Sequence, residues 1–195
     1  MKTISVKLCL FLLFIVSIVS GEVCIRYDYS SNCTSYPITD FYIGLQVSQP
    51  DNMITRDFDM TTSLGWMFVL NESYDLGPSV LFSAYNSPDG WHSQFGIRGN
   101  LRYHIDSDFH LDLSPGLILM DSPFPDGFAG YTVEFSVGWR DWVGIATRLD
   151  FVDTFESDHD QVLQIALRFG SYGGMGLTSV GIIGGGIAYM VSRID

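Results

Sequence analysis

Two histidines and an aspartate are the first side chains that could act together chemically. His104 and His110 flank the short segment 106–108, which is typical of a tight turn, and Asp112 follows on the same parity as His110. A turn that sets His104 opposite His110 on antiparallel strands also sets Arg102 opposite Asp112. Imidazoles beside a carboxylate can bind a metal or transfer protons. In a polar interior they more often serve as hydrogen-bonded filling, and we expect no metal site.

A second group contains the residue types of a serine hydrolase or acyltransferase. His92 and Ser93 are adjacent, and Asp89, Asp126 and Asp158 lie in nearby links. Catalysis would need a histidine, a hydroxyl and a carboxylate to converge. Adjacent residues on a strand point to opposite faces, so His92 and Ser93 cannot readily meet, and the sequence has no G-x-S-x-G motif. We therefore assign no catalytic residue and favour a protein that is not an enzyme.

The cysteines indicate a disulfide rather than a cofactor site. Cys9 lies in the apolar N-terminal run, which leaves Cys24 and Cys33 in the remainder of the chain. Their spacing is not that of a zinc site, and in an oxidising compartment a nearby pair more often forms a disulfide. Lipid attachment at Cys24 is disfavoured because Val23 precedes it where a small residue is usual. The sequence predicts a Cys24–Cys33 disulfide and no cofactor.

The N-terminus has the three parts of a secretory signal peptide. Lys2 and Lys7 are followed by the apolar run 8–19 and then by the small residues Ser20 and Gly21. A run of this length is too short to span a hydrocarbon core of about 30 Å. We expect cleavage after Gly21, so that 1–21 is removed on export.

The charge balance excludes one class of partner. The chain has 22 acidic and ten basic residues, and the loss of Lys2 and Lys7 leaves eight arginines and a net charge of about −14 (8 minus 22). Binding of nucleic acid needs basic surface to neutralise phosphates. Arginine without lysine suits buried, paired positions. These arginines are Arg26, Arg56, Arg98, Arg102, Arg140, Arg148, Arg168 and Arg193.

The elements that must position these residues have a period of two. In segment 91–105 the odd positions are mostly apolar or aromatic, and the even positions are polar, charged or glycine. This alternation is typical of a strand with one apolar and one polar face. It recurs in eight candidate strands, many of them about ten residues long, the length of a tilted membrane strand. The candidate strands are 41–48, 63–70, 76–83, 91–105, 109–119, 131–139, 143–151 and 163–170.

The connections between these strands alternate in length. Tight turns are expected at 71–74, 106–108 and 140–141, and longer acidic links at 49–59, 86–90, 121–127 and 153–160. Short turns at one rim and longer loops at the other are the arrangement of outer-membrane barrels. With a periplasmic N-terminus, the long acidic links would lie outside the cell.

Three features predict that the apolar face points outward. The polar face is rich in small residues, which suits the interior of a narrow barrel, and aromatic residues gather near strand ends, as in membrane girdles. Charges on the polar face can also pair, since a turn at 140–141 sets Glu134 opposite Arg148. We therefore predict a charge network inside the barrel. Its members are Arg98, Arg102, Asp112, Glu134, Arg148, Arg168, His104 and His110.

With this pattern the chain resembles the small outer-membrane β-barrels of Gram-negative bacteria, the group that includes the OmpA transmembrane domain, OmpX and PagP. The resemblance covers roughly 41–172 and rests on strand pattern, loop alternation and the recurring motifs Leu76-Gly77-Pro78-Ser79 and Leu113-Ser114-Pro115-Gly116. It implies an all-β, antiparallel up-and-down transmembrane barrel in contact with outer-membrane lipids. Such barrels usually end in an aromatic residue, whereas this chain ends Ser192-Arg193-Ile194-Asp195.

Pro78 and Pro115 fall on the lipid-facing parity within strands. Proline removes a donor from the ladder of hydrogen bonds. The simpler interpretation is a bulge near the short turns, and the alternative, by analogy with PagP, is a lateral gap for lipid entry.

The sequence leaves the strand count and the role open. The glycine-rich segment 173–191 opposes a stable helix but lacks clean alternation, so we predict eight to ten strands. The expected organisation is a signal peptide (1–21), an N-terminal periplasmic tail (22–40) and a β-barrel (41–195). We favour a structural or surface-interaction role with an unidentified external partner and oligomeric state. The alternatives are a lipid-modifying enzyme, a narrow channel, or a soluble lipocalin-like carrier with Phe95, Ile97, Leu113 and Val133 facing one cavity.

Overall fold

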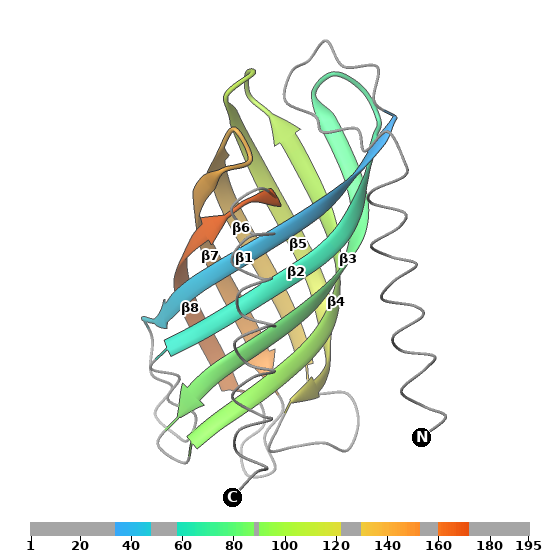
Figure 1. Cartoon of the computed structure of the whole chain (residues 1–195). Helices are drawn as coiled ribbons and strands as arrows, with labels where there is room; N and C mark the ends of the chain where they lie inside the picture. Colours follow the sequence, from blue (N-terminus) through green and yellow to red (C-terminus); the bar gives the residue numbers. More distant parts are fainter. Residues whose placement is uncertain (1–33, 48–57, 88–89, 122–129, 153–159, 172–195) are drawn as a thin grey trace, which may run out of the picture.

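Eight antiparallel strands form one closed barrel in which each strand pairs with its sequence neighbours and the last returns to the first (Figure 1). This computed structural model describes residues 34–47, 58–87, 90–121, 130–152 and 160–171. The predicted all-β up-and-down barrel is confirmed, at the lower end of the expected strand number. The strands are β1 (Ser35–Gln46), β2 (Phe58–Val69), β3 (Tyr74–Ser87), β4 (Gly90–His104), β5 (Phe109–Asp121), β6 (Gly130–Trp139), β7 (Val143–Val152) and β8 (Asp160–Phe169).

Three predictions lie outside the described residues. They are the signal peptide 1–21, the Cys24–Cys33 disulfide and the role of segment 173–191. Among the residues that the structure does describe, no helix is long and apolar enough to cross a membrane.

The short turns gather at one end of the barrel, the upper end in Figure 1, which we call the turn end; the opposite end is the link end. Two of the turns are closed by side chains. The Asn71 Oδ1 atom accepts the backbone N–H groups of Ser73 and Tyr74, and Asp106 Oδ1 accepts those of Asp108 and Phe109. Asn and Asp favour such turns because their short side chains bond to the backbone ahead.

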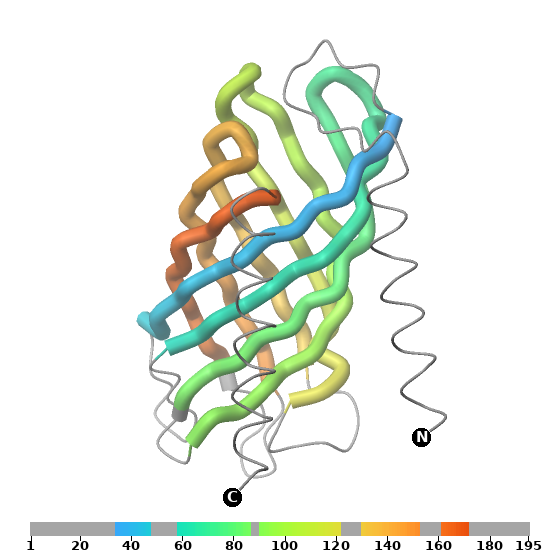
Figure 2. The backbone as a smooth tube through the Cα atoms, in the orientation of Figure 1, coloured from blue at the N-terminus to red at the C-terminus, as the bar shows by residue number. Residues whose placement is uncertain are grey.

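The barrel is inverted relative to a soluble protein, since its apolar side chains point outward. Along β6, buried and exposed residues alternate without a break. Phe95, Ile97, Leu113 and Val133 are 36–43 % exposed on the outer wall. The lipocalin-like alternative, which needs these four side chains in an internal cavity, is therefore wrong. The oblique course of the strands in Figure 2 is the tilt that closure of a barrel requires.

The first strand begins earlier than the alternation indicated. β1 starts at Ser35, inside the range 22–40 that we assigned to a tail. Tyr36 and Ile38 face the interior and are 4 % and 3 % exposed, while the alternate positions are Ser35, Pro37 and Thr39. Because the inward residues here include apolar ones and the outward ones are small or polar, the binary pattern that marks the other strands is absent.

A β-bulge changes the parity of β5 near its end. Gly96 pairs with Ile118, whereas Phe95 pairs with Met120, so Leu119 has no opposite residue. After this extra residue, Asp121 faces the interior although its odd number matches the outward positions. The alternation alone had placed Asp121 in a link.

Pro78 and Pro115 interrupt ladders without shifting the register. The β2–β3 pairing skips Trp66/Pro78 and Met67/Gly77, and the β4–β5 pairing skips Gly99/Pro115 and Asn100/Ser114. The shift in register lies at Phe95/Gly96, so the bulge that we predicted near the prolines is elsewhere. The physical reason is that proline removes a donor but adds no residue.

Candidate functional site: the charged lumen

The lumen is the only place in the described chain where many ionisable side chains converge. The five predicted residues Arg98, Arg102, Glu134, Arg148 and Arg168 are each at most 4 % exposed. Asp112 and His110 are also buried, and the side chain of His104 is 14 % exposed. All eight residues predicted for the network thus point inward, because they share the parity opposite to the apolar wall. Their ion pairs form two clusters and one middle pair.

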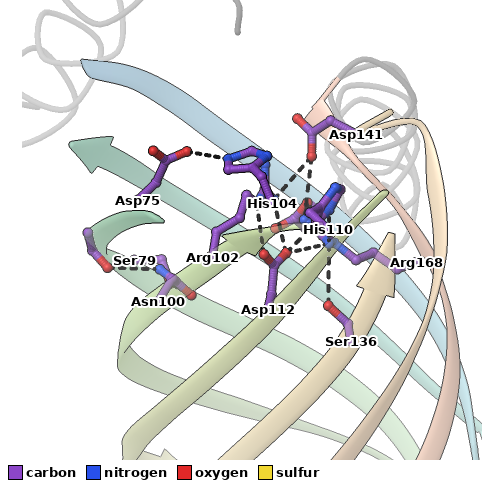
Figure 3. Close-up of polar contacts among 12 residues, drawn as sticks. Asp75, Ser79, Asn100, Arg102, His104, His110, Asp112, Ser136, Asp141 and Arg168 are labelled. Atoms are coloured by element: carbon purple, nitrogen blue, oxygen red, sulfur yellow. Dashed lines mark hydrogen bonds and ion pairs between the residues drawn. The ribbon is translucent and has the colours of Figure 1, made fainter. Parts of the chain in front are cut away.

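Arg168 is the centre of the first cluster, which lies toward the turn end (Figure 3). Its Nε and Nη2 atoms donate to Asp40 Oδ1 at 3.0 and 2.8 Å, and its Nη1 atom donates to Asp112 Oδ2 at 2.5 Å. Arg102 adds a two-pronged contact to Asp112, with distances of 2.8 and 3.0 Å. Charge-assisted, bidentate contacts of this kind are the strong class of hydrogen bond. The turn-end cluster comprises Asp40, Asp75, Arg102, His104, His110, Asp112, Asp141 and Arg168.

His110 acts in this cluster as a hydrogen-bond acceptor. Arg168 Nη1 lies 3.1 Å from His110 Nε2. Because a guanidinium can only donate, Nε2 must carry the lone pair and Nδ1 the proton of a neutral imidazole. The distance of 3.6 Å between His110 Nε2 and Asp112 Oδ2 is too long for a hydrogen bond. His110 is thus a neutral filling residue, as the simpler sequence interpretation expected.

The turn between β6 and β7 supplies a carboxylate that the sequence did not assign to the lumen. Arg140 and Asp141 have φ values of 49° and 56°, and Trp142 N donates to Trp139 O at 3.0 Å, which defines a type I′ turn. Asp141 Oδ1 lies 3.2 Å from Arg102 Nη2 and 3.5 Å from Arg168 Nη2. The left-handed backbone, unusual for two residues with side chains, thus aims Asp141 at both arginines.

Opposing effects act on the Asp141 carboxyl group. Burial acts to raise its pKa, but the guanidinium groups of Arg102 and Arg168 lower the pKa below its usual value. Gly170 leaves room for the turn, because a Cβ atom there would lie 2.2 Å from the Asp141 carbonyl oxygen.

His104 and His110 are opposite residues, as predicted, but they bind different partners. The register pairs them, with ring centroids 6.2 Å apart. His104 Nε2 lies 2.7 Å from Asp75 Oδ2, which also accepts a hydrogen bond from the Tyr36 hydroxyl at 2.6 Å. A small cavity of about 30 Å³ between the histidines and the turns has room for about one water molecule. In the described ranges, no group of three or more His, Cys, Asp or Glu could hold a metal ion.

The middle pair differs from the expected one. Glu134 and Arg148 are opposite in the register, as predicted, yet Glu134 accepts a hydrogen bond from Arg98 Nη1 at 2.5 Å. The Arg98 guanidinium also lies over the Tyr42 ring, 5.7 Å from its centroid. Nε and Nη2 of Arg98 find no hydrogen-bond partner among the described residues. Long side chains can cross the lumen, so register alone does not choose their partners.

Asp59 is the centre of the second cluster, toward the link end. It accepts hydrogen bonds from Thr61 at 2.5 Å, Ser83 at 2.7 Å, Arg148 at 2.9 Å and Gln164 at 3.3 Å. Arg148 also lies 3.3 Å from Asp150 through its Nε atom. Beside them, Tyr85 donates to Asp121 at 2.6 Å and Gln94 donates at 3.3 Å. The link-end cluster comprises Asp59, Thr61, Ser83, Tyr85, Gln94, Asp121, Arg148, Asp150 and Gln164.

The catalytic alternative gains no geometry from the described residues. His92 faces inward and stacks on Tyr85 with ring centroids 5.4 Å apart, whereas Ser93 is exposed on the outer wall. The two side chains therefore lie on opposite faces, as predicted. Asp89, Asp126 and Asp158 lie outside the described residues.

Sequence reasoning missed several lumenal carboxylates for identifiable reasons. Asp40 lay in the assigned tail, Asp59 and Asp121 in links, and Asp141 in a turn. A continued parity signal could have found two of them, since Asp40 follows the inward parity of Tyr42, and Asp59 follows that of Ser63. No periodic signal could have found Asp121 or Asp141, because a bulge and a left-handed turn place them.

Comparisons with known proteins concern the fold alone. No protein-family model and no curated protein matches the chain. Among solved structures, Ail, the attachment invasion locus protein of Yersinia pestis, has a TM-score of 0.42 and 10 % identity over 70 % of this chain and 95 % of Ail. A structure described as de novo design of transmembrane beta-barrels has a TM-score of 0.40 and 9 % identity over 72 % of this chain and 98 % of the designed one. Both likenesses are weak and carry no information about function.

Proposed function

We propose that this chain is an integral outer-membrane β-barrel whose lumen is filled by paired charges, with a structural or surface-interaction role and no catalytic activity. One observation carries the proposal: the wall exposes large apolar side chains on every strand, while the ionisable groups of the strands are buried. Water would favour the reverse arrangement. A closed barrel with an apolar exterior leaves no sheet edge in lipid over its paired strands.

Aromatic side chains at both ends of the wall support a membrane location. Exposed tryptophan and tyrosine residues favour the level of lipid head groups. At the turn end these include Trp66, Tyr74, Tyr103, Trp139 and Trp142, and at the link end Trp91 and Tyr131. The apolar band between them would contact lipid acyl chains, so membrane lipids are the first partners that we propose.

The filled lumen supports a role other than diffusion. An interior of eight strands is just wide enough for side chains to occupy, and here arginines from β4, β7 and β8 cross it to reach carboxylates on other strands. A wide pore is incompatible with this packing. A role at the surface would then fall to the links at the link end, much of which lies outside the described residues.

Membrane location is tested by cell fractionation combined with heat-modifiability. We expect the protein in the outer-membrane fraction, and we expect it to migrate as a compact species in detergent unless boiled. The control is Phe135→Arg on the outer wall, which should destabilise the membrane-embedded form by about 2–4 kcal/mol if it lies near the bilayer midplane. Recovery of the unmodified chain in the soluble fraction, with no change of mobility on boiling, would refute the proposal.

A further inference from the structure

The seam between the first and last strands is paired over only half of β1. β8 pairs with β1 from Phe41/Phe169 to Gln46/Gln164, whereas β1 begins at Ser35 and pairs with β2 along its whole earlier half. Figure 2 shows the start of β1, in blue, running well past the end of β8, in red-orange. Within the described residues, no β8 residue pairs with the stretch Ser35–Asp40, which we call the seam edge.

Two backbone contacts show which atoms of the seam edge point toward β8. Val47 N donates to Leu163 O at 2.9 Å, and Thr39 N reaches Ser171 Oγ at 3.5 Å. Main-chain groups of alternate residues point to the same side of a strand, so Ser35 and Pro37 also face this side. Pro37 has no N–H group, and a proline at such a position is typical of a strand edge.

The outward side chains of the seam edge differ from the rest of the wall. They are Ser35, Pro37 and Thr39, with no large apolar residue. Inward, Tyr36 and Asp40 are fixed by hydrogen bonds to Asp75 and Arg168. The seam edge is thus a well-anchored strand whose outer side and free carbonyl edge would be costly against lipid.

We infer that the chain following Ser171 continues β8 and pairs with the seam edge, with Pro37 opposite Gly173 and Ser35 opposite Met175. The register favours this occupant, because Ser171 already lies opposite Thr39 when the β1–β8 pairing is extended. The next residues, Tyr172-Gly173-Gly174-Met175, carry no charge, so the completed seam would suit a lipid environment. Glycine at the position opposite Pro37 leaves room for the proline ring.

The test is disulfide formation in the full-length protein, folded in detergent, with Cys9, Cys24 and Cys33 replaced by serine. Ser35→Cys combined with Met175→Cys is the in-register pair, and Thr39→Cys combined with Met175→Cys is the matched control, displaced by four residues or about 13 Å. We expect the in-register pair to form an intramolecular disulfide on the order of tenfold faster, because a disulfide needs Cα atoms within about 7 Å. Peptide mapping by mass spectrometry identifies the bond, and heat-modifiability confirms folding.

A second pair guards against a variant that fails to fold. Pro37→Cys with Gly173→Cys should also cross-link faster than the displaced control. Equal rates for in-register and displaced pairs would refute the inference, and so would a disulfide between two chains through Ser35→Cys, which would identify a second copy as the occupant. The lipid argument depends on the proposed membrane location but the register does not, so cross-linking in a protein that fractionates as soluble would refute only the proposed function.

Discussion

The two ends of the lumen solve the same problem with opposite central charges. At the turn end, one cation, Arg168, holds Asp40 and Asp112 and lies near Asp141. At the link end, one anion, Asp59, accepts from Arg148 and three neutral side chains. Removal of a central cation leaves several like charges together, whereas removal of a central anion leaves one arginine that still has Asp150 beside it. The comparison predicts that the turn end is the more sensitive to substitution.

The largest effect is expected for Arg168→Met. This change leaves Asp40 and Asp112 buried without their shared cation, and we expect the free energy of unfolding to fall by about 3–5 kcal/mol. Urea unfolding in detergent micelles at pH 7 measures it. Arg98→Met is the matched control, because Arg98 has a single carboxylate partner, Glu134. A loss no greater than that of the control would contradict the central role of Arg168.

A smaller loss is expected for Asp59→Asn at the link end. The amide keeps the shape and can still accept hydrogen bonds, so we expect a loss of about 2 kcal/mol. A double-mutant cycle with Arg148→Gln isolates the coupling of the pair. If Asp59→Asn is as damaging as Arg168→Met, the contrast between the two ends is wrong.

Asp141→Asn tests whether the left-handed turn is held by charge. Asparagine tolerates positive φ but has no charge, so we expect a loss of about 1 kcal/mol at neutral pH. The lowered pKa of Asp141 means that its contribution is fully present above the unfolded-state pKa, about 3.9, and is lost as pH falls through the lower folded-state pKa. The difference between the parent and Asp141→Asn should therefore shrink below about pH 4.

Asp141→Gly separates the strain of the turn from the carboxylate. Glycine relieves the positive φ and also removes the side chain. A more stable Asp141→Gly protein would show that strain outweighs the ion pairs, and a pH-independent difference for Asp141→Asn would exclude a role of the charge.

The smallest effect is expected for Arg140→Gln, one residue before Asp141. Arg140 Nε contacts Asp108 at 2.6 Å, but the two side chains are 52 % and 38 % exposed. Such surface pairs contribute about 0–1 kcal/mol, and glutamine keeps the same backbone strain. Thermal unfolding followed by gel mobility should be almost unchanged. A loss as large as that of Asp141→Asn would mean that the exposed pair, and not the lumenal one, fixes the turn.

Local pattern was enough to predict the wall and part of the lumen. Wherever apolar and polar residues alternated over a strand, as in β4 and β6, the predicted face was correct, because side chains alternate with a period of two. The tight turns then fixed register, so Arg102/Asp112, His104/His110 and Glu134/Arg148 are opposite each other as expected. The prediction stopped where the pattern stopped, as in the earlier half of β1.

The sequence by itself determined the inverted barrel, its eight alternating strands and the inward position of its arginines, since these follow from spacing between near neighbours. Only the tertiary structure decided who pairs with whom across the lumen. Arg168 meets Asp40 from the other end of the sheet, and Arg98 takes the Glu134 that faces Arg148 in the register. Closure and strand tilt bring such residues together, and neither property is written in any local stretch of chain.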